Sequence, residues 1–274
     1  MVGIFDGHGG ERASQYLSEY FTQRFLARYS ITSNIPNAFH ESKPFFSSLI
    51  AFSQLDNELA ILAGTSQLFD TEGSTATIAL VLNDELYLSY VGDSEAILVQ
   101  NSGKNLIKLC KEVDTAENVK EAERVEKAGG IVLKVGSTQR VQGELALTRS
   151  FGDSKYKTYV TAEPHIVQQK LNSEDEFLII ATDGLWNVLT HEEVGRIVTE
   201  LKDLPENEIA EKLYAETMEK NCTDNVTIAV INLKKRRKLM EEGSFYPPAA
   251  PTSRYTKENR KAFMFPQEGG NLID

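Results

Sequence analysis

The spacing of the hydrophobic residues changes from a helical to a β pattern near residue 74, and that change restricts the possible folds more than any other feature. In residues 11–29 and 45–62 the apolar positions recur every three or four residues, which predicts two amphipathic helices. Stripes of this kind form protein core far more often than partner surfaces, so we expect both to be buried. They consist of Ala13, Leu17, Tyr20, Phe21, Phe25 and Leu26, followed by Phe45, Leu49, Phe52, Leu55, Leu59 and Leu62.

From residue 74 onwards, short β-rich runs replace the helical period. The runs STATIALVL, ELYLSYVG, EAILVQ and NLIKL are separated by the turn sequences Asn83-Asp84 and residues 101–103, which predicts an antiparallel meander. Further buried strands are predicted for residues 2–5 and for the runs FLIIATDG and NVTIAVINL.

Three more helices are predicted in the second half of the chain. Residues 116–128 form a polar helix that ends at two glycines. Thr190 and Glu193 make a capping box that opens a helix to about residue 201, and residues 204–220 make another. Paired helices and runs of strands predict an α+β protein whose antiparallel sheets carry helices on their outer faces.

The chain divides at about residue 233. Of its 274 residues 41% are hydrophobic, enough for one large core or two modest ones, and element patterns follow one another up to residue 233. Residues 234–274 begin with the run KKRRK and continue with prolines and polar residues. We therefore predict one domain over residues 1–233 and a basic, proline-containing, disordered tail over residues 234–274. The basic run is typical either of a solvated charge cluster or of a nuclear signal.

Charge and composition exclude several classes of protein. A net charge of −11 argues against a general nucleic-acid-binding surface. The sequence contains no apolar run long enough to span a bilayer and no segment typical of a signal peptide. Its two cysteines, Cys110 and Cys222, do not make a disulfide framework, which suits a reducing compartment. We therefore expect a cytoplasmic protein, with the nucleus as the alternative, that binds neither nucleic acid nor membrane.

Three aspartates share one context. Asp6, Asp183 and Asp224 each lie at the boundary of a buried apolar strand. A turn-forming aspartate explains any one of them, but three in the same context favour one acidic cluster. Burial raises the pKa of a carboxyl group unless a cation keeps it charged, and oxygen ligands suit Mg²⁺ or Mn²⁺. With four histidines and two cysteines in the whole chain, a zinc site is poorly supported.

The chain resembles the metal-dependent protein phosphatase family, the type 2C serine/threonine phosphatases, over residues 3–233. Eight motifs occur in the order of that family: FDGHGG, GSTATIALV, YVGDSEAIL, RVEKAGG, RVQGELALTRSFGD, TAEP, ATDGLWNVL and TDNVTIAVI. The resemblance implies a fold of two stacked antiparallel sheets with a pair of helices on each outer face. It also implies activity on phosphoserine and phosphothreonine, with a phosphoprotein as substrate.

The resemblance assigns roles to individual residues. In the family, two metal ions hold a water or hydroxide that attacks phosphorus in line. Asp6 would bridge both ions, the Gly7 carbonyl would bind the second, and Asp183 and Asp224 would complete the protein ligands of the first. His8 would be the general acid that protonates the leaving seryl or threonyl oxygen.

The chain departs from the family pattern before the first motif. Family members carry a preceding segment with a phosphate-binding arginine and an acidic ligand of the second ion, whereas only five residues precede Asp6 here. We therefore expect an N-terminally incomplete domain whose second metal site lacks one ligand. Asn187 stands where the family has an aspartate that helps to hold a third ion. Asp114 resembles another ligand of that ion but stands one residue too close to Arg124. The resemblance therefore gives a third ion little support. Glu95 replaces the usual arginine.

The resemblance predicts a mobile flap at residues 154–162 and structural roles, in turns or backbone hydrogen bonds, for Asp93 and Asp153. Two hypotheses of different class remain. The chain is an active phosphatase, or it is an inactive pseudophosphatase that binds phosphoproteins or a regulatory partner. In both cases we expect a monomer.

Overall fold

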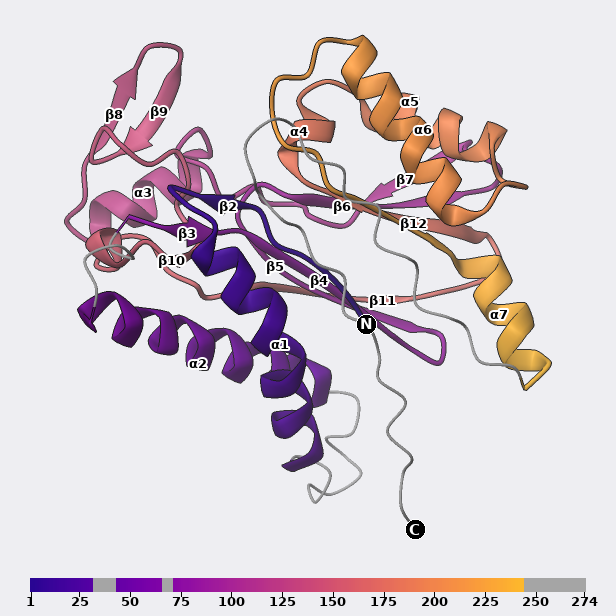
Figure 1. The fold of residues 1–274 in the computed structure, drawn as a ribbon, viewed down its shortest axis with the longest axis horizontal. Helices are drawn as coiled ribbons and strands as arrows, with labels where there is room; N and C mark the ends of the chain where they lie inside the picture. Colours follow the sequence, from indigo (N-terminus) through magenta and orange to yellow (C-terminus); the bar gives the residue numbers. More distant parts are fainter. Residues whose placement is uncertain (32–42, 66–70, 244–274) are drawn as a thin grey trace.

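Two antiparallel four-stranded sheets lie face to face, with helices on both outer sides, in a computed structural model that describes residues 1–31, 43–65 and 71–243 (Figure 1). The predicted α+β architecture of stacked sheets between helical layers is therefore confirmed. None of the helices in these ranges combines the length and the apolar character needed to cross a membrane.

The first sheet is covered by the two N-terminal helices. Helices α1 (Arg12–Ile31) and α2 (Lys43–Thr65) pack against each other and lie beneath the strands in Figure 1. In spatial order the strands are β1 (Val2–Ile4), β4 (Ala76–Leu82), β5 (Glu85–Val91) and β11 (His165–Lys170).

The second sheet is covered by helices α5 (His191–Glu200) and α6 (Glu206–Glu219). The predicted capping box opens α5, since the Thr190 hydroxyl accepts from the Glu193 N–H and the Glu193 carboxylate accepts from the Thr190 N–H. In spatial order the strands are β13 (Ile228–Asn232), β12 (Asp175–Ala181), β6 (Glu95–Gln100) and β7 (Asn105–Lys108).

The predicted meander of four strands is wrong in one respect. Strands β4 and β5 pair, and so do β6 and β7, but β5 and β6 belong to different sheets. The chain crosses between the sheets at the turn that contains Gly92, which has φ +97°. Because each sheet lies between the other sheet and a helical layer, both strands are buried on both faces, and their hydrophobic pattern does not indicate which sheet each one joins.

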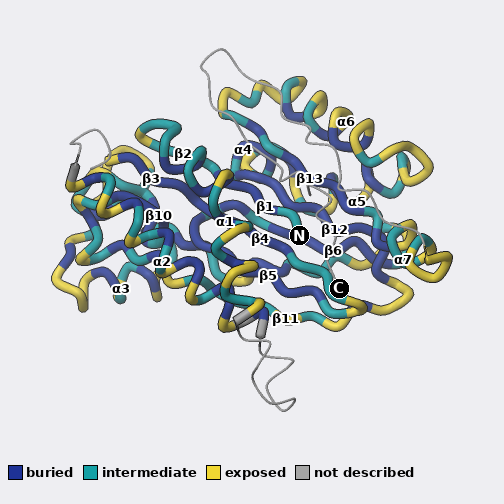
Figure 2. Tube along the Cα trace, turned by 60° about the horizontal axis from the view of Figure 1, so that its bottom comes forward, coloured by how far each residue is buried: buried dark blue, intermediate teal, exposed yellow. Residues whose placement is uncertain are grey.

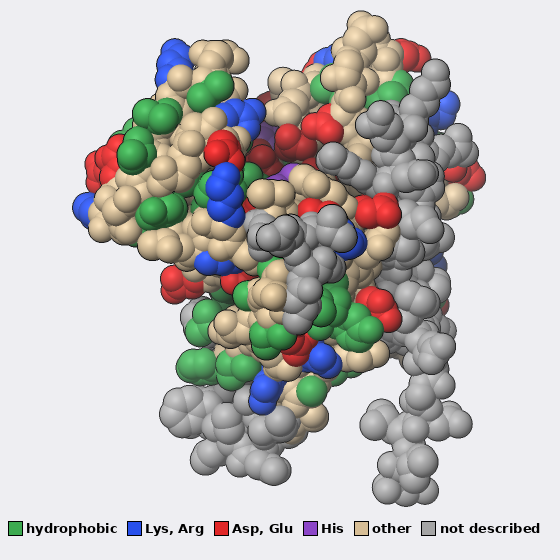
Figure 3. Space-filling model, turned by 60° about the vertical axis from the view of Figure 1, so that its left-hand side comes forward, with side chains coloured by type: hydrophobic (Ala, Val, Ile, Leu, Met, Phe, Trp, Pro, Cys, Tyr) green, Lys and Arg blue, Asp and Glu red, His purple; other side chains and the backbone are tan. Residues whose placement is uncertain are grey.

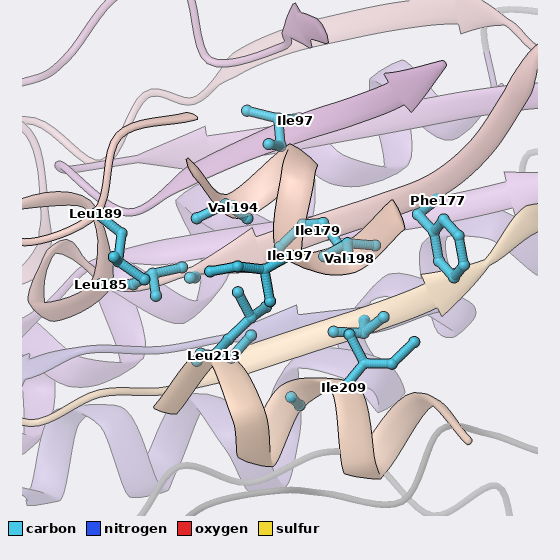
Figure 4. Packing of buried hydrophobic residues seen from close by; sticks show 14 of the residues in the cluster. Ile97, Phe177, Ile179, Leu185, Leu189, Val194, Ile197, Val198, Ile209 and Leu213 are labelled. Atoms are coloured by element: carbon cyan, nitrogen blue, oxygen red, sulfur yellow. The ribbon is translucent and has the colours of Figure 1, made fainter. Parts of the chain in front are cut away.

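The core has three layers. One fills the space between α1, α2 and the first sheet, one lies between the sheets, and one lies between the second sheet and α5 and α6. In Figure 4 the side chains of Ile197 and Leu213, from the two helices, approach Ile179 on β12. In Figure 2 the strands are coloured mainly as buried, and the exposed segments are concentrated on the outer helices.

Several short elements lie at one end of the sheets. A three-stranded sheet of order β10-β3-β2 joins three chain segments that are distant in sequence. The β8–β9 hairpin, which the sequence analysis missed, projects from the same end (Figure 1). The short elements are β2 (Gly7–His8), β3 (Gly73–Ser74), α3 (Val119–Lys127), β8 (Val132–Val135), β9 (Thr138–Val141), β10 (Phe151–Gly152), η4 (Ser154–Tyr156) and α4 (Asp183–Trp186).

The predicted flap, residues 154–162, is anchored to the rest of the domain. Its Tyr156 and Val160 side chains are buried against Val125 of α3. The Lys157 ammonium lies 2.8 Å from the Asp56 carboxylate of α2. These contacts attach the segment to α3 and α2, and its mobility stays a prediction.

The prediction of a disordered tail from residue 234 is wrong for its first residues. They form helix α7 (Leu233–Glu241), capped by Asn232, whose side chain accepts from the Lys235 N–H. Lys234 and Lys235 pair with Glu176 and Glu206 at 2.7 and 3.0 Å, so part of the basic run holds α7 to the domain. Residues 244–274 lie outside the described residues.

Candidate active site

Asp6 lies between strands β1 and β2, where the chain runs tightly against α1. The Thr75 N–H donates to the Asp6 carbonyl at 2.9 Å, and the Asp6 N–H donates to the Thr75 hydroxyl at 3.2 Å. A Cβ on the next residue, Gly7, would stand 2.5 Å from the Ser14 hydroxyl oxygen of α1. Any other residue at position 7 would force Ser14 to shift, so the missing side chain lets the Asp6–His8 segment lie close to α1.

Asp183 and Asp224 come from two neighbouring strands of the second sheet. Asp183 follows β12 and begins α4, and Asp224 lies in the loop that leads to β13. A Cβ on Gly184 would stand 2.3 Å from the Asn225 carbonyl oxygen. The absence of a side chain at Gly184 therefore allows the two loops to touch, which brings Asp183 close to Asp224.

The acidic residues act on one another electrostatically. Burial raises the pKa of Asp183, and the charge of Asp224 raises it further, while hydrogen bonds with the Asn187 amide (3.1 Å), the Gly184 N–H and the Asp6 side chain lower it in part. Asp183 thus lies within interaction range of both Asp6 and Asp224. Figure 3 shows acidic side chains and a histidine at the bottom of a notch in the upper part of the surface.

Asp93 belongs to the same acidic neighbourhood, although the sequence analysis gave it a structural role. Burial, followed by the charge of Asp183, raises the pKa of Asp93 to about 7. A signal for it was present in the sequence, since Asp93 also follows the end of a buried apolar strand, β5.

The donor chemistry of this neighbourhood fits a hard divalent cation. Carboxylates and a backbone carbonyl are the ligands that Mg²⁺ and Mn²⁺ prefer, and in the described ranges no Lys or Arg forms an ion pair with Asp93, Asp183 or Asp224. Nevertheless, within that part of the chain no three His, Cys, Asp or Glu side chains are already close enough together to hold an ion. The carboxylates would therefore have to draw together around a cation, which would offset the repulsion that raises the pKa values of Asp93 and Asp183.

His8 lies beside the acidic residues and has a buried partner. Its Nε2 atom is 2.7 Å from Asp153 Oδ2. The His8 side chain is 25% exposed, whereas that of Asp153 is 1% exposed. The sequence predicted a structural role for Asp153, in a turn or in backbone hydrogen bonds, and did not indicate this contact, because the two residues stand 145 positions apart.

Asp114 is fully buried and bound by protein groups, so the structure gives no support to its resemblance to a third-ion ligand. Its carboxylate accepts from the Gly92 N–H at 2.9 Å and lies 2.7 Å from His165 Nε2. Glu95, for which the sequence offered no role, pairs with Lys108 at 2.6 Å and lies 3.1 Å from His191.

Comparison with known proteins identifies relatives of this chain. A family model described as "Protein phosphatase 2C" matches residues 1–226. Probable protein phosphatase 2C 71 of Arabidopsis thaliana is 34% identical over 244 residues, which cover 89% of this chain and 51% of that protein. Probable protein phosphatase 2C 59 of the same plant is 36% identical over 231 residues, which cover 84% of this chain and 69% of that protein. The chain thus spans between about half and about two thirds of the length of these relatives.

Solved structures show the same fold. A Caenorhabditis elegans sex determining protein superposes with a TM-score of 0.76 at 24% identity, over 89% of this chain and 58% of that one. Serine-threonine phosphatase 2C from Toxoplasma gondii superposes with a TM-score of 0.68 at 20% identity, over 83% and 82% of the two chains.

Proposed function

Because the chain belongs to the protein phosphatase 2C family, we propose that it is a metal-dependent phosphatase that acts on phosphoserine and phosphothreonine in proteins. Its relatives support protein phosphatase activity, and the family generally depends on Mg²⁺ or Mn²⁺. One observation carries the proposal furthest. Asp183 interacts with the charge of Asp224 and with the side chain of Asp6, although the three residues come from separate chain segments.

The residues of this chain divide the work in the proposed reaction. The carboxylates of Asp6, Asp183 and Asp224 and the carbonyl of Gly7 would hold the cations. When bound, such ions neutralise negative charge on a phosphoryl group. His8 would protonate the leaving seryl or threonyl oxygen, and its partial exposure leaves the ring accessible to a substrate.

The expected substrate, partners and location of the enzyme follow from the same proposal. A phosphoprotein is its substrate, and the negative net charge of the chain disfavours nucleic acid as a partner. The proposal takes the enzyme to be a monomer located in the cytoplasm, with the nucleus as the alternative.

Release of phosphate from a phosphothreonine peptide tests the proposed function. The activity of the 274-residue chain on this peptide should require Mn²⁺ and vanish in excess chelator. Asp183→Asn should abolish release, because it removes a charged ligand. Asp203→Asn, an equal charge change on an exposed turn, should leave the rate unchanged.

Two results would contradict the proposal. Undiminished release in excess chelator would remove the metal from the reaction. Saturable binding of the phosphopeptide without release, in the presence of Mn²⁺, would instead favour the pseudophosphatase hypothesis.

A further inference from the structure

His8 and Asp153 meet directly above Gly73. In the three-stranded sheet, His8 of β2 is paired with Gly73 of β3, and Gly73 is paired on its other side with Gly152 of β10. A Cβ on Gly73 would stand 2.1 Å from Asp153 Oδ2 and 2.4 Å from His8 Nε2. The hydrogen bond between the two side chains therefore occupies the space that any other residue at position 73 would fill.

Asp153 is held in place by several groups besides His8. Its backbone adopts a left-handed conformation, φ +51°, which is uncommon for a residue other than glycine and persists where the surroundings enforce it. Its N–H donates to the Glu72 carbonyl at 2.9 Å, and the buried Ser150 hydroxyl donates to the same oxygen, Oδ2, that faces His8. The carboxylate thus has a fixed position and a fixed direction.

Helix α2 anchors the turn that carries Asp153. The Gly152 N–H donates to Asp56 Oδ1 at 3.0 Å. Lys157 reaches the same carboxylate at 2.8 Å and also donates to the Ser150 carbonyl at 2.9 Å. The support for Asp153 therefore comes from α2, from β3 and from the segment after β10, which is more than a simple turn requires.

We propose that Asp153 is a positioning residue for His8, whose Nε2–H it accepts so that Nδ1 is the ring nitrogen that serves the substrate. A carboxylate offers only acceptor sites, so Nε2 must be the donor. A buried carboxylate of this kind fixes the orientation and tautomer of an imidazole. The inference rests on the proposed function, because it assumes that His8 transfers a proton.

The proton transfer then follows one route. As the bond between phosphorus and the seryl or threonyl oxygen breaks, its electron pair stays on that oxygen, which takes the proton of Nδ1. The ring keeps its Nε2–H on Asp153. The attacking water supplies the new oxygen on phosphorus and loses its proton to solvent.

The activity test uses Asp153→Asn in the full 274-residue chain. A poor alkoxide leaving group needs protonation, whereas an aryl phosphate expels a phenolate and needs little. We expect kcat to fall by about 10–100-fold on a phosphoserine peptide and far less on an aryl phosphate, with little change in KM. In a His8→Gln background, Asp153→Asn should cause no further loss, since it acts through His8.

Two further variants separate positioning from a purely structural role. Gly73→Ala should produce the same selective loss, because its Cβ displaces the ends of two side chains and meets no backbone atom closer than these. Asp175→Asn also removes a buried carboxylate, one that accepts from Gln100 and the Asn172 N–H at the far end of β12, and it should leave the ratio of the two rates unchanged. Equal losses on both substrates, or additive losses with His8→Gln, would overturn the proposal.

A spectroscopic measurement tests the hydrogen bond between His8 and Asp153 without relying on catalytic activity. In the wild-type chain the His8 Nε2–H should give a downfield, slowly exchanging NMR resonance that is absent from both His8→Gln and Asp153→Asn. Absence of such a resonance from the wild type, or its survival in Asp153→Asn, would overturn the pairing. If the resonance behaves as expected but the chain releases no phosphate, the proposed function fails and the His8–Asp153 contact stands.

Discussion

Gly184 shows how much one missing side chain contributes to the acidic cluster. The Asn225 carbonyl occupies the place of its Cβ, and the loop that carries Asp224 lies against the first turn of α4 for that reason. The approach is made by backbone atoms, which cannot move aside as the end of a side chain can. The distance between Asp183 and Asp224 therefore depends on a residue that has no chemistry of its own.

Gly184→Ala should accordingly weaken both the fold and metal binding. The added methyl group must push the two loops apart, so we expect the free energy of unfolding to fall by ~1–3 kcal/mol and the affinity for Mn²⁺ to fall with it. Chemical denaturation and calorimetric titration measure the two effects.

Gly64→Ala is the matched control for that substitution. Gly64 lies near the end of α2, and a Cβ there meets nothing within 4 Å. It should raise the free energy of unfolding by up to ~1 kcal/mol and leave Mn²⁺ affinity unchanged. Equal Mn²⁺ affinity in the Gly184 variant and the wild type would show that the contact between the two loops does not position the ligands.

At the scale of elements, α7 is a helix that the hydrophobic pattern of the sequence does not predict. Its sequence LKKRRKLME is dominated by charge, and its one buried side chain is Leu233. The helix is held by the Asn232 cap, by ion pairs of Lys234 and Lys235, and by the Arg237 guanidinium, which donates to the Asp175 carbonyl at 2.7 Å. The cap comes from the residue just before the helix, and the other partners come from distant segments of the chain. None of these contacts produces a hydrophobic period in the sequence.

Replacing the cap distinguishes a docked helix from a disordered segment. Asn232→Ala should lower the free energy of unfolding by about 1 kcal/mol, because it removes the acceptor for the Lys235 N–H. Asn232→Asp keeps an acceptor at the same place and should cost much less. If the alanine and aspartate variants are both as stable as the wild type, α7 does not contribute to the folded domain.

The sequence predicted those elements whose signals lie within their own residues. The stripes of α1 and α2, the capping box of α5 and the apolar run of β12 are all local signals. The assignment of β5 and β6 to different sheets was missed because strands buried on both faces have the same composition in either sheet. The β8–β9 hairpin was missed because β8 is mostly exposed, with Leu133 and Val135 about half exposed, and β9 is mostly half-buried, so neither strand alternates between buried and exposed residues.

At the scale of the whole molecule, the candidate site lies where the two sheets end together. Asp6 leaves the first sheet, Asp183 and Asp224 leave the second, and Asp93 stands at the crossing between them. The strand-end context predicted the first three, since the sequence records where each strand stops. It did not predict Asp93 as a member of the cluster or Asp153 as a partner of His8, because those contacts depend on how the sheets and the β10-β3-β2 sheet are placed in space.

This placement has a consequence for stability. The pKa of Asp183 is raised above its ordinary value by burial and by Asp224, so the ionised carboxylate at neutral pH costs folding free energy when no cation is bound. A cation that binds only the folded state reverses this effect, and at 100 times its dissociation constant it contributes about 2.7 kcal/mol. Removing the charge of Asp183 should therefore stabilise the metal-free chain and destabilise the metal-loaded chain relative to the wild type.

The thermal midpoints of the wild type and Asp183→Asn, each measured in chelator and in saturating Mn²⁺, test this most directly. We expect the variant to unfold at the higher temperature in chelator. In Mn²⁺ we expect the wild type to gain about 5–10 °C, the variant to gain little, and the order of the two midpoints to reverse. An equal Mn²⁺-dependent rise in both proteins, or no rise in either, would contradict the assignment of Asp183 and its neighbours as the metal site.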